Sequence, residues 1–301
     1  MTTAAPAVTR RDAANLLGAA VLYGGVFPIN RFAAESGWPA VAFALWPAAA
    51  AGIVLLLLAL ARGEGRGIGR RHVIAWLALG GLVIGAPIGI LVEAAQHLDA
   101  SILTLVLCLS PILTLVIAAS TGSEPFDRRV LFGMLLGTAG IALIVWPESG
   151  VIGAGNVKWF LLALIAPAMF ALANNCAVWL RPPAASALVM ATGTLLGGAL
   201  IAVIIALAIG APLAPGAPGA GHLPPFVLAS VLNALFYPLF FMIVAAIGAA
   251  RFSIFNYLAV AAGILWSMAA FGEAPAPAFW VAGALMLLGM HVALRPRASG
   301  P

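Results

Sequence analysis

Charged residues are scarce in this chain, and their scarcity excludes a soluble domain of any size. Only 8% of the 301 residues are Asp, Glu, Lys or Arg, whereas 64% are apolar. Soluble domains carry about 25% charged residues, so this composition indicates a chain that lies in lipid. The stretches without any charged residue are 13–30, 36–61, 73–92, 101–123, 130–147, 159–180, 182–250, 252–272 and 274–294.

The lengths of these stretches predict the number of membrane crossings. A helix needs about 20 apolar residues to cross the bilayer core. The longest stretch divides at the Pro/Gly-rich sequence "APLAPGAPGAGHLPP" (211–225) into two spans. We therefore expect an all-α polytopic membrane protein with ten transmembrane helices, and membrane lipid as its surroundings.

Basic residues are few as well, and their positions predict an orientation. With the N-terminus in the cytoplasm and ten alternating spans, 12 of the 14 Lys and Arg residues lie inside, and only Arg31 and Lys158 lie outside. This bias follows the positive-inside rule. We expect a bacterial inner-membrane protein with both termini in the cytoplasm. The net charge of +5 then reflects topology and not a nucleic-acid partner.

Sequence patterns of catalysis and cofactor binding are missing too. There is no H-E-x-x-H, G-x-S-x-G or P-loop sequence, the four histidines are scattered, and the two cysteines both lie inside spans. We expect no enzyme, no cofactor and no metal site. Without a P-loop the chain cannot hydrolyse ATP alone, so any transport would follow the gradient of the substrate or of an ion.

The spans that are present divide into two related halves, 1–150 and 151–301. The sequence "SEPFDRRVLFGMLLGTAGIAL" (123–143) resembles "GEAPAPAFWVAGALMLLGMHVAL" (272–294). Each half has five spans, and an odd number forces the second half to insert upside down. Inverted repeats of this kind are typical of secondary transporters, which work by alternating access.

Weak points of the helices recur in both halves and predict hinges. Pro87 corresponds to Pro238, and Pro111 corresponds to Gly263. A proline removes one helix hydrogen bond and bends the helix. The alternative is that these are the ordinary prolines and glycines of membrane helices.

These features together resemble the drug/metabolite transporter superfamily. The ten spans in two five-span halves, and "SPILTLVIAASTGSEP" (110–125) echoed by "GEAP" (272–275), are similar to its EamA-type permeases. Among these, the chain is most similar to bacterial exporters of aromatic and other amino acids. The resemblance implies a basket of helices around a central cavity, with spans 5 and 10 at its periphery.

Polar and aromatic side chains inside spans predict the lining of a substrate cavity. Tyr23, Phe27 and Asn30 follow i, i+4, i+7 and share one helix face. An aromatic face with neutral polar groups suits a small amphipathic ligand, whereas ordinary core packing is the alternative for each residue. The candidate cavity residues are Tyr23, Asn30, Trp46, Glu93, Asn174, Asn175, Asn233, Phe236, Tyr237 and Trp266.

Three of these candidates carry a more specific hypothesis. Asn30 and Asn175 occupy matched positions at opposite depths, as two symmetric gates would require; permanent hydrogen bonds between helices are the alternative. Glu93 precedes His97 by one turn, so the pair could carry a coupling proton or hold a substrate ammonium group. The alternative places Glu93 in the wet interface at the end of its span.

The near-absence of lysine, of which Lys158 is the single example, argues against phosphorylated substrates, which need cations in the cavity. We expect export of neutral and aromatic amino acids with broad specificity. Efflux of lipophilic cations or drugs is the alternative, with Glu93 as the dominant contact. A membrane-embedded enzyme or assembly subunit is the alternative of another class. The "GMLLG" pattern (133–137) predicts close helix packing and a possible homodimer contact.

Overall fold

The computed structural model describes residues 9–64, 68–94, 96–98, 100–145, 157–183, 185–214, 221–272 and 277–295. Within these ranges the chain forms helices and their connections, without any strand. The expected boundary between the two halves, at residues 150 and 151, lies outside the described residues.

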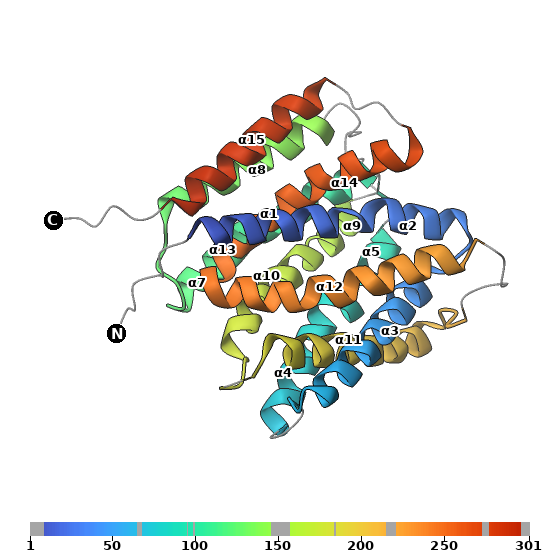
Figure 1. Cartoon of the computed structure of the whole chain (residues 1–301). Coiled ribbons are helices and arrows are strands. Elements are labelled where there is room, and N and C mark those ends of the chain that lie inside the picture. Colours follow the sequence, from blue (N-terminus) through green and yellow to red (C-terminus); the bar gives the residue numbers. More distant parts are fainter. Residues whose placement is uncertain are drawn as a thin grey trace.

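The helices follow one another along the whole described chain (Figure 1). The first half contains α1 (Arg10–Gly24), α2 (Val26–Glu35), α3 (Ala40–Ala61), α4 (Arg70–Gly80), the π-helix η1 (Gly81–Gly85), α5 (Ala86–Ala94), α6 (Ala100–Leu107), α7 (Ser110–Ser120) and α8 (Arg128–Val145). The second half contains α9 (Val157–Ala163), α10 (Ile165–Trp179), α11 (Ala187–Ile209), α12 (Leu223–Ile247), α13 (Ala249–Ser253), α14 (Phe255–Phe271) and α15 (Ala278–Leu294).

Six helical stretches among the described residues are long and apolar enough to cross a membrane. One of them, α3, has 22 residues, and at 1.5 Å per residue its length of about 33 Å matches the bilayer core. Large apolar side chains point outward, and Leu57, Leu207 and Leu223 are 62%, 67% and 65% exposed. In lipid such side chains need no protein partner. The chain is therefore an all-α polytopic membrane protein, as the sequence predicted.

Several of the ten consecutive helical segments are interrupted, so that two or three helices form one segment. A proline in the first turn of the new helix follows most of these breaks, because it has no N–H to donate to the preceding turn. Pro28 follows the first break in this way, and Pro167 follows the break between α9 and α10. The breaks lie at Gly25, at Cys108 and Leu109, at Leu164 and at Ile254.

The proposed hinge residues differ in how they affect their helices. Pro87 is the second residue of α5, directly after η1. Since it has no N–H to donate to the carbonyl of Val83, the helix can widen into the π-turn there. Pro111 is the second residue of α7. Pro238 and Gly263 instead lie within the continuous helices α12 and α14.

The glycines of the 133–137 pattern serve packing within this chain. Gly133 on α8 faces α15 so closely that a Cβ on Gly289 would lie 2.5 Å from the carbonyl oxygen of Gly133. Gly137 lies against the ring of Tyr257. Small residues let membrane helices approach closely and gain van der Waals contact. The chain's own helices thus cover this face of α8, so the pattern is not free to bind a second copy.

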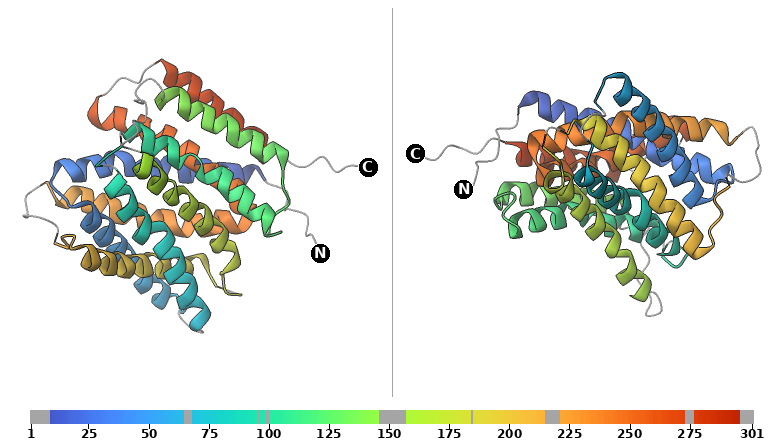
Figure 2. Two further views of the ribbon diagram at one scale, coloured as in Figure 1. Left: turned by 180° about the vertical axis from the view of Figure 1, so that it is seen from behind. Right: turned by 90° about the horizontal axis from the view of Figure 1, so that it is seen from below.

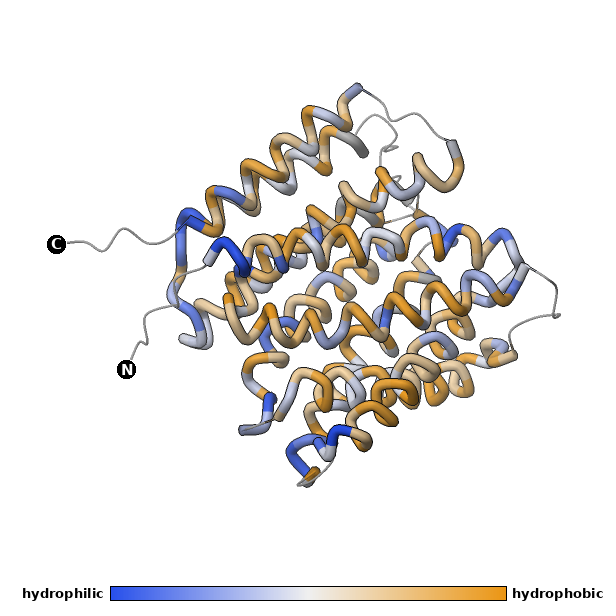
Figure 3. Tube along the Cα trace, viewed as in Figure 1, coloured by the Kyte–Doolittle hydropathy of each residue, from blue (hydrophilic) through white to orange (hydrophobic). Residues whose placement is uncertain are grey.

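The bundle has two lateral edges and two ends. Figure 2 shows α8 and α15 side by side at one edge and α3, α4 and α11 together at the other, and these helices are in contact. α1 begins and α15 ends at the same end of the bundle, which we call the termini end (Figure 1). Hydrophilic residues gather at the helix ends, most densely at the termini end (Figure 3).

Candidate functional site

Two neighbouring cavities lie among the helices of the bundle. The larger one, called here the wide cavity, has a volume of about 520 Å³ and extends toward the end opposite the termini, where Trp38 and Ala40 line it. The smaller one, the narrow cavity, has a volume of about 220 Å³ and lies nearer the termini end. Together they have the size of a site for a small metabolite. Six residues line both cavities: Tyr23, Phe27, Val83, Leu107, Phe170 and Tyr237.

Aromatic rings dominate the narrow cavity. The ring of Tyr23 on α1 is tilted against that of Phe236 on α12, with centroids 4.1 Å apart, and Phe236 stacks on Phe255 of α14 at 5.0 Å. Phe240 and Phe252 continue this surface at 4.9 Å. Ring pairs at 4.5–7 Å are favourable beyond their buried area. Four helices from both halves thus build one aromatic wall.

The polar groups at the cavities are neutral. Asn30 and Asn233 line the wide cavity, whereas Asn174 and Asn256 line the narrow one. Among the described residues, no Asp, Glu, Lys, Arg or His lines either cavity. Such a site can offer amide dipoles, tyrosine hydroxyls and ring faces, and it offers no full charge.

The two adjacent asparagines of α10 play different parts. Asn174 reaches the narrow cavity, and its Nδ2 donates to Thr114 Oγ1 at 3.3 Å. Asn175 lines neither cavity; its Nδ2 donates to the carbonyl oxygens of Thr114 at 3.2 Å and of Ala171 at 2.9 Å. In this conformation both asparagines therefore join α10 to α7, which is the arrangement of the helix-bonding alternative.

Two buried polar atoms beside the contact between α10 and α7 have no hydrogen-bond partner within the described chain. Asn175 and Ser110 are each 1% exposed, and within the described chain Asn175 Oδ1 and Ser110 Oγ form no hydrogen bond. Thr114, which is fully buried, donates its hydroxyl to the carbonyl oxygen of Ser110 at 2.8 Å. A buried polar atom without a partner costs about 1–3 kcal/mol. We call Ser110, Thr114, Asn174 and Asn175 the polar layer.

The two tryptophans among the candidates lie away from the cavities. Trp46 and Trp266 are 44% and 46% exposed on the outside of the bundle. Their indole N–H groups donate to the carbonyl oxygens of Leu213 and Val21, each at 2.8 Å. The partners that these indoles needed inside spans are thus backbone carbonyls, which fasten neighbouring segments together.

Glu93 also lies away from both cavities. It is near the end of α5, its side chain is 49% exposed, and its Oε1 lies 3.9 Å from His97 Nε2. Gln96 Nε2 donates to its other carboxylate oxygen at 3.2 Å. This position agrees with the expectation of a group at the wet end of the span. Of the candidate residues, Tyr23, Asn30, Asn174, Asn233, Phe236 and Tyr237 are the ones that line a cavity.

Some residues of the site had not been selected from the sequence. Asn256 lines the narrow cavity from the start of α14. Tyr257 is fully buried beside it, where its hydroxyl lies 2.9 Å from Thr138 Oγ1 and donates to the carbonyl oxygen of Cys108 at 3.2 Å. The available signal was an asparagine in an apolar span, the same signal that identified Asn174.

An all-α membrane bundle that encloses a cavity of metabolite size has the architecture of a transporter. Residues 13–146 match the EamA-like transporter family. The sequence-based expectation of an EamA-type permease is thereby confirmed at the level of the family. Proteins of this family are transporters and not enzymes, in agreement with what the sequence predicted for this chain.

Among solved structures, one titled "Crystal structure of protein" is similar over 95% of this chain and 97% of that chain, with a TM-score of 0.79 and 18% sequence identity. At this identity the likeness concerns the fold alone, and it supports the polytopic helical architecture. No curated protein matches the chain.

Proposed function

We propose that this chain exports amino acids, foremost neutral and aromatic ones, across the bacterial inner membrane by alternating access. The observation that carries the proposal is the lining of the two cavities, which combines aromatic rings with neutral amides and includes no charged side chain among the described residues. A substrate with a net charge would leave that charge unpaired, whereas a zwitterion can bind to amide and backbone dipoles.

Backbone groups at helix breaks supply the dipoles that a zwitterion needs. Leu107 and Cys108, at the break before α7, line the narrow cavity, and Val83 of η1 lines both cavities. Transporters commonly bind amino-acid carboxylates and ammonium groups at such interrupted helices. The aromatic wall then receives the side chain of the substrate.

Alternating access is supported by the placement of the breaks. The first segment of each half is interrupted, at Gly25 and at Leu164, and so is the fourth, at Leu109 and at Ile254. Matched interruptions are expected of two halves built as inverted repeats of five spans. We propose that these halves, 1–150 and 151–301, rock about the cavities, with Pro87, Pro111, Pro238 and Gly263 among the flexible points.

The test is uptake of radiolabelled phenylalanine or threonine by liposomes that contain the purified protein, with and without a pH gradient. We expect saturable uptake that falls about fivefold to tenfold in Tyr237→Ala, since one aromatic contact is lost, and that also falls in Asn30→Ala. Trp280→Ala, a substitution of a 61% exposed ring outside the cavities, is the control and retains uptake. Uptake no greater than in empty liposomes contradicts the proposal.

Efflux of lipophilic cations is the second candidate, favoured by the aromatic wall, because ring faces attract cations. It predicts that a lipophilic cation competes with phenylalanine and that Tyr23→Ala and Phe236→Ala weaken its transport. Transport of the cation by liposomes that take up no amino acid would favour this candidate.

A further inference from the structure

The polar layer lies between the narrow cavity and the termini end. Asn174 belongs to both the layer and the cavity lining. α13, a helix of five residues, packs against α7 and α10, the two helices that carry the layer. Phe252 of α13 lines the narrow cavity. α13 therefore separates the cavity and the layer from the loops of the termini end.

α13 is joined to its neighbours by two interruptions. Gly248 precedes it with φ 85° and ψ 167°, a backbone conformation that favours glycine, and Ile254 separates it from α14. A short helix between two such points can move as a unit without unwinding α12 or α14. Interruptions of this kind are common hinge positions.

A carboxylate from the first half holds α13 in place. Glu124, in the loop between α7 and α8, accepts hydrogen bonds on Oε1 from the backbone N–H of Ala249 at 2.6 Å and of Ala250 at 3.3 Å. The approach is so close that a Cβ on Gly248 would lie 2.6 Å from the same oxygen. Asp127 of the same loop lies 3.9 Å from Arg251 of α13. Charge-assisted hydrogen bonds of this kind are stronger than neutral ones.

We infer that the polar layer is the second part of the substrate path and that α13 is its lid, closed in this structure by Glu124. When Glu124 releases the backbone of Ala249 and Ala250, α13 moves away from α7 and α10. Ser110 Oγ and Asn175 Oδ1 then find partners in water or substrate, and Asn174 passes the substrate from the narrow cavity into the layer. The inference rests on the proposed transport function and assigns the substrate path at the closed termini end.

The test measures the access of a charged, water-soluble maleimide to a thiol at Ser110, in full-length protein in lipid nanodiscs. Ser110→Cys is introduced into a chain whose two native cysteines, Cys108 and Cys176, are replaced by alanine. We expect slow labelling in this background and labelling at least about tenfold faster after Glu124→Ala, since both hydrogen bonds from α13 to the carboxylate are then lost.

Glu64→Ala is the matched control, because Glu64 accepts a hydrogen bond from Ser186 and contacts α11 instead of α13. We expect no acceleration with this variant. A second reporter, Asn233→Cys in the wide cavity, separates gating from unfolding. Opening of the lid shifts the population away from this conformation, so labelling at Asn233→Cys falls while labelling at Ser110→Cys rises.

Gly248→Ala repeats the experiment without removing the carboxylate, since its Cβ displaces Glu124. This variant must also speed the labelling at Ser110→Cys and slow the labelling at Asn233→Cys. The inference is overturned if Ser110→Cys stays unreactive in both variants, if Glu64→Ala accelerates labelling equally, or if both reporters become faster together. None of these readouts needs a substrate, so a failure of amino-acid uptake leaves the test of the lid intact.

Discussion

The termini end and the opposite end of the bundle are closed by different kinds of contact. At the termini end, Glu124 and Asp127 bind α13 of the other half through a carboxylate–amide contact and an ion pair with Arg251, which is only 6% exposed. At the opposite end, Trp38 Nε1 donates to the carbonyl oxygen of His222 at 3.1 Å, and Arg31 lies over the ring of Phe271 at 4.1 Å.

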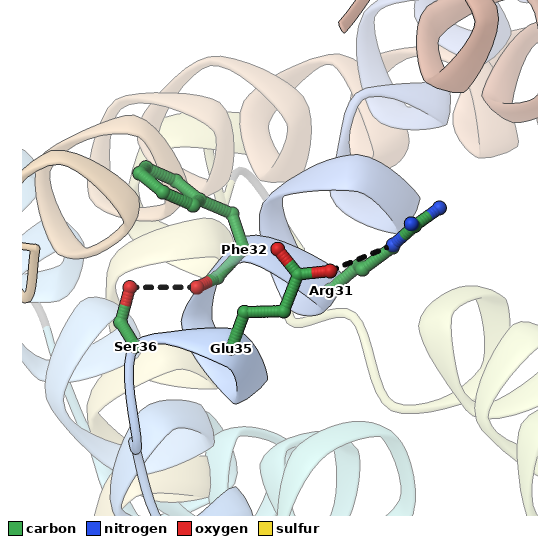
Figure 4. A network of polar contacts seen from close by, with 4 residues as sticks. All are labelled: Arg31, Phe32, Glu35 and Ser36. Carbon is green, nitrogen blue, oxygen red and sulfur yellow. Dashed lines mark hydrogen bonds and ion pairs between the residues drawn. The ribbon is translucent and has the colours of Figure 1, made fainter. Parts of the chain in front are cut away.

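At the end opposite the termini, the contacts are more exposed to solvent, as the polar network at the end of α2 shows (Figure 4). Arg31 Nε pairs with Glu35 Oε1 at 2.9 Å, but both side chains are about half exposed. Exposed pairs contribute about 0–1 kcal/mol, whereas breaking a buried pair costs about 3–5 kcal/mol. The wide cavity extends toward this more weakly closed end. In the proposed transport cycle, this conformation is therefore closed at the termini end and admits substrate at the other.

The largest effect is expected from Arg251→Ala. This substitution leaves Asp127, which is 14% exposed, without the buried guanidinium beside it. We expect a loss of about 3 kcal/mol of stability, seen as a lower Tm of the purified protein. Arg31→Ala at the opposite end should change the Tm little. Equal losses from the two substitutions would remove the distinction between the ends.

A smaller effect is expected from a pair of glycine substitutions. Gly248 and Gly37 both have positive φ, 85° and 83°, so alanine strains the backbone at either position by about 1–3 kcal/mol. Only at Gly248 does the new Cβ meet a neighbour, namely Glu124; at Gly37 nothing lies within 4 Å. We therefore expect Gly248→Ala to lower the Tm more than Gly37→Ala. A larger loss at Gly37 would contradict the close contact of Glu124.

The smallest effect is expected from pH. Burial raises the pKa of the Glu124 carboxyl above its ordinary value of 4.5, although the backbone N–H groups of Ala250 and Ala249 and the charge of Arg251 lower it. The folded state then binds a proton more readily than the unfolded state, so the contribution of Glu124 to stability falls as the pH rises above 4.5.

The measurement compares the Tm of the parent and of Glu124→Gln between about pH 5 and pH 8. We expect the parent to lose stability relative to the variant as the pH rises. Asp127, the other carboxylate near Arg251, is present in both proteins and cancels in the difference. Parallel pH profiles of the two proteins would show that burial does not outweigh the other contacts of Glu124.

Polar and aromatic residues inside spans predicted part of the cavity lining. Tyr23 and Asn30 were predicted to share one helix face; they lie on α1 and α2, on either side of the break at Gly25, and both line the wide cavity. Phe236 and Tyr237 line the narrow one. The same signal was less informative for Trp46 and Trp266, because an indole inside a span can face a cavity or bond to a backbone carbonyl on the outside. Periodicity does not distinguish these two positions.

The sequence by itself determined that the chain crosses a membrane repeatedly as helices, because apolar stretches in lipid must satisfy their own backbone groups. Only the tertiary structure decided which polar side chains meet. Asn175 bonds to Thr114 across 61 residues of chain, and Glu124 bonds to Ala249 across 125. Such contacts depend on how whole helices pack, and helix packing in lipid follows shape and small residues more than any pattern along one helix.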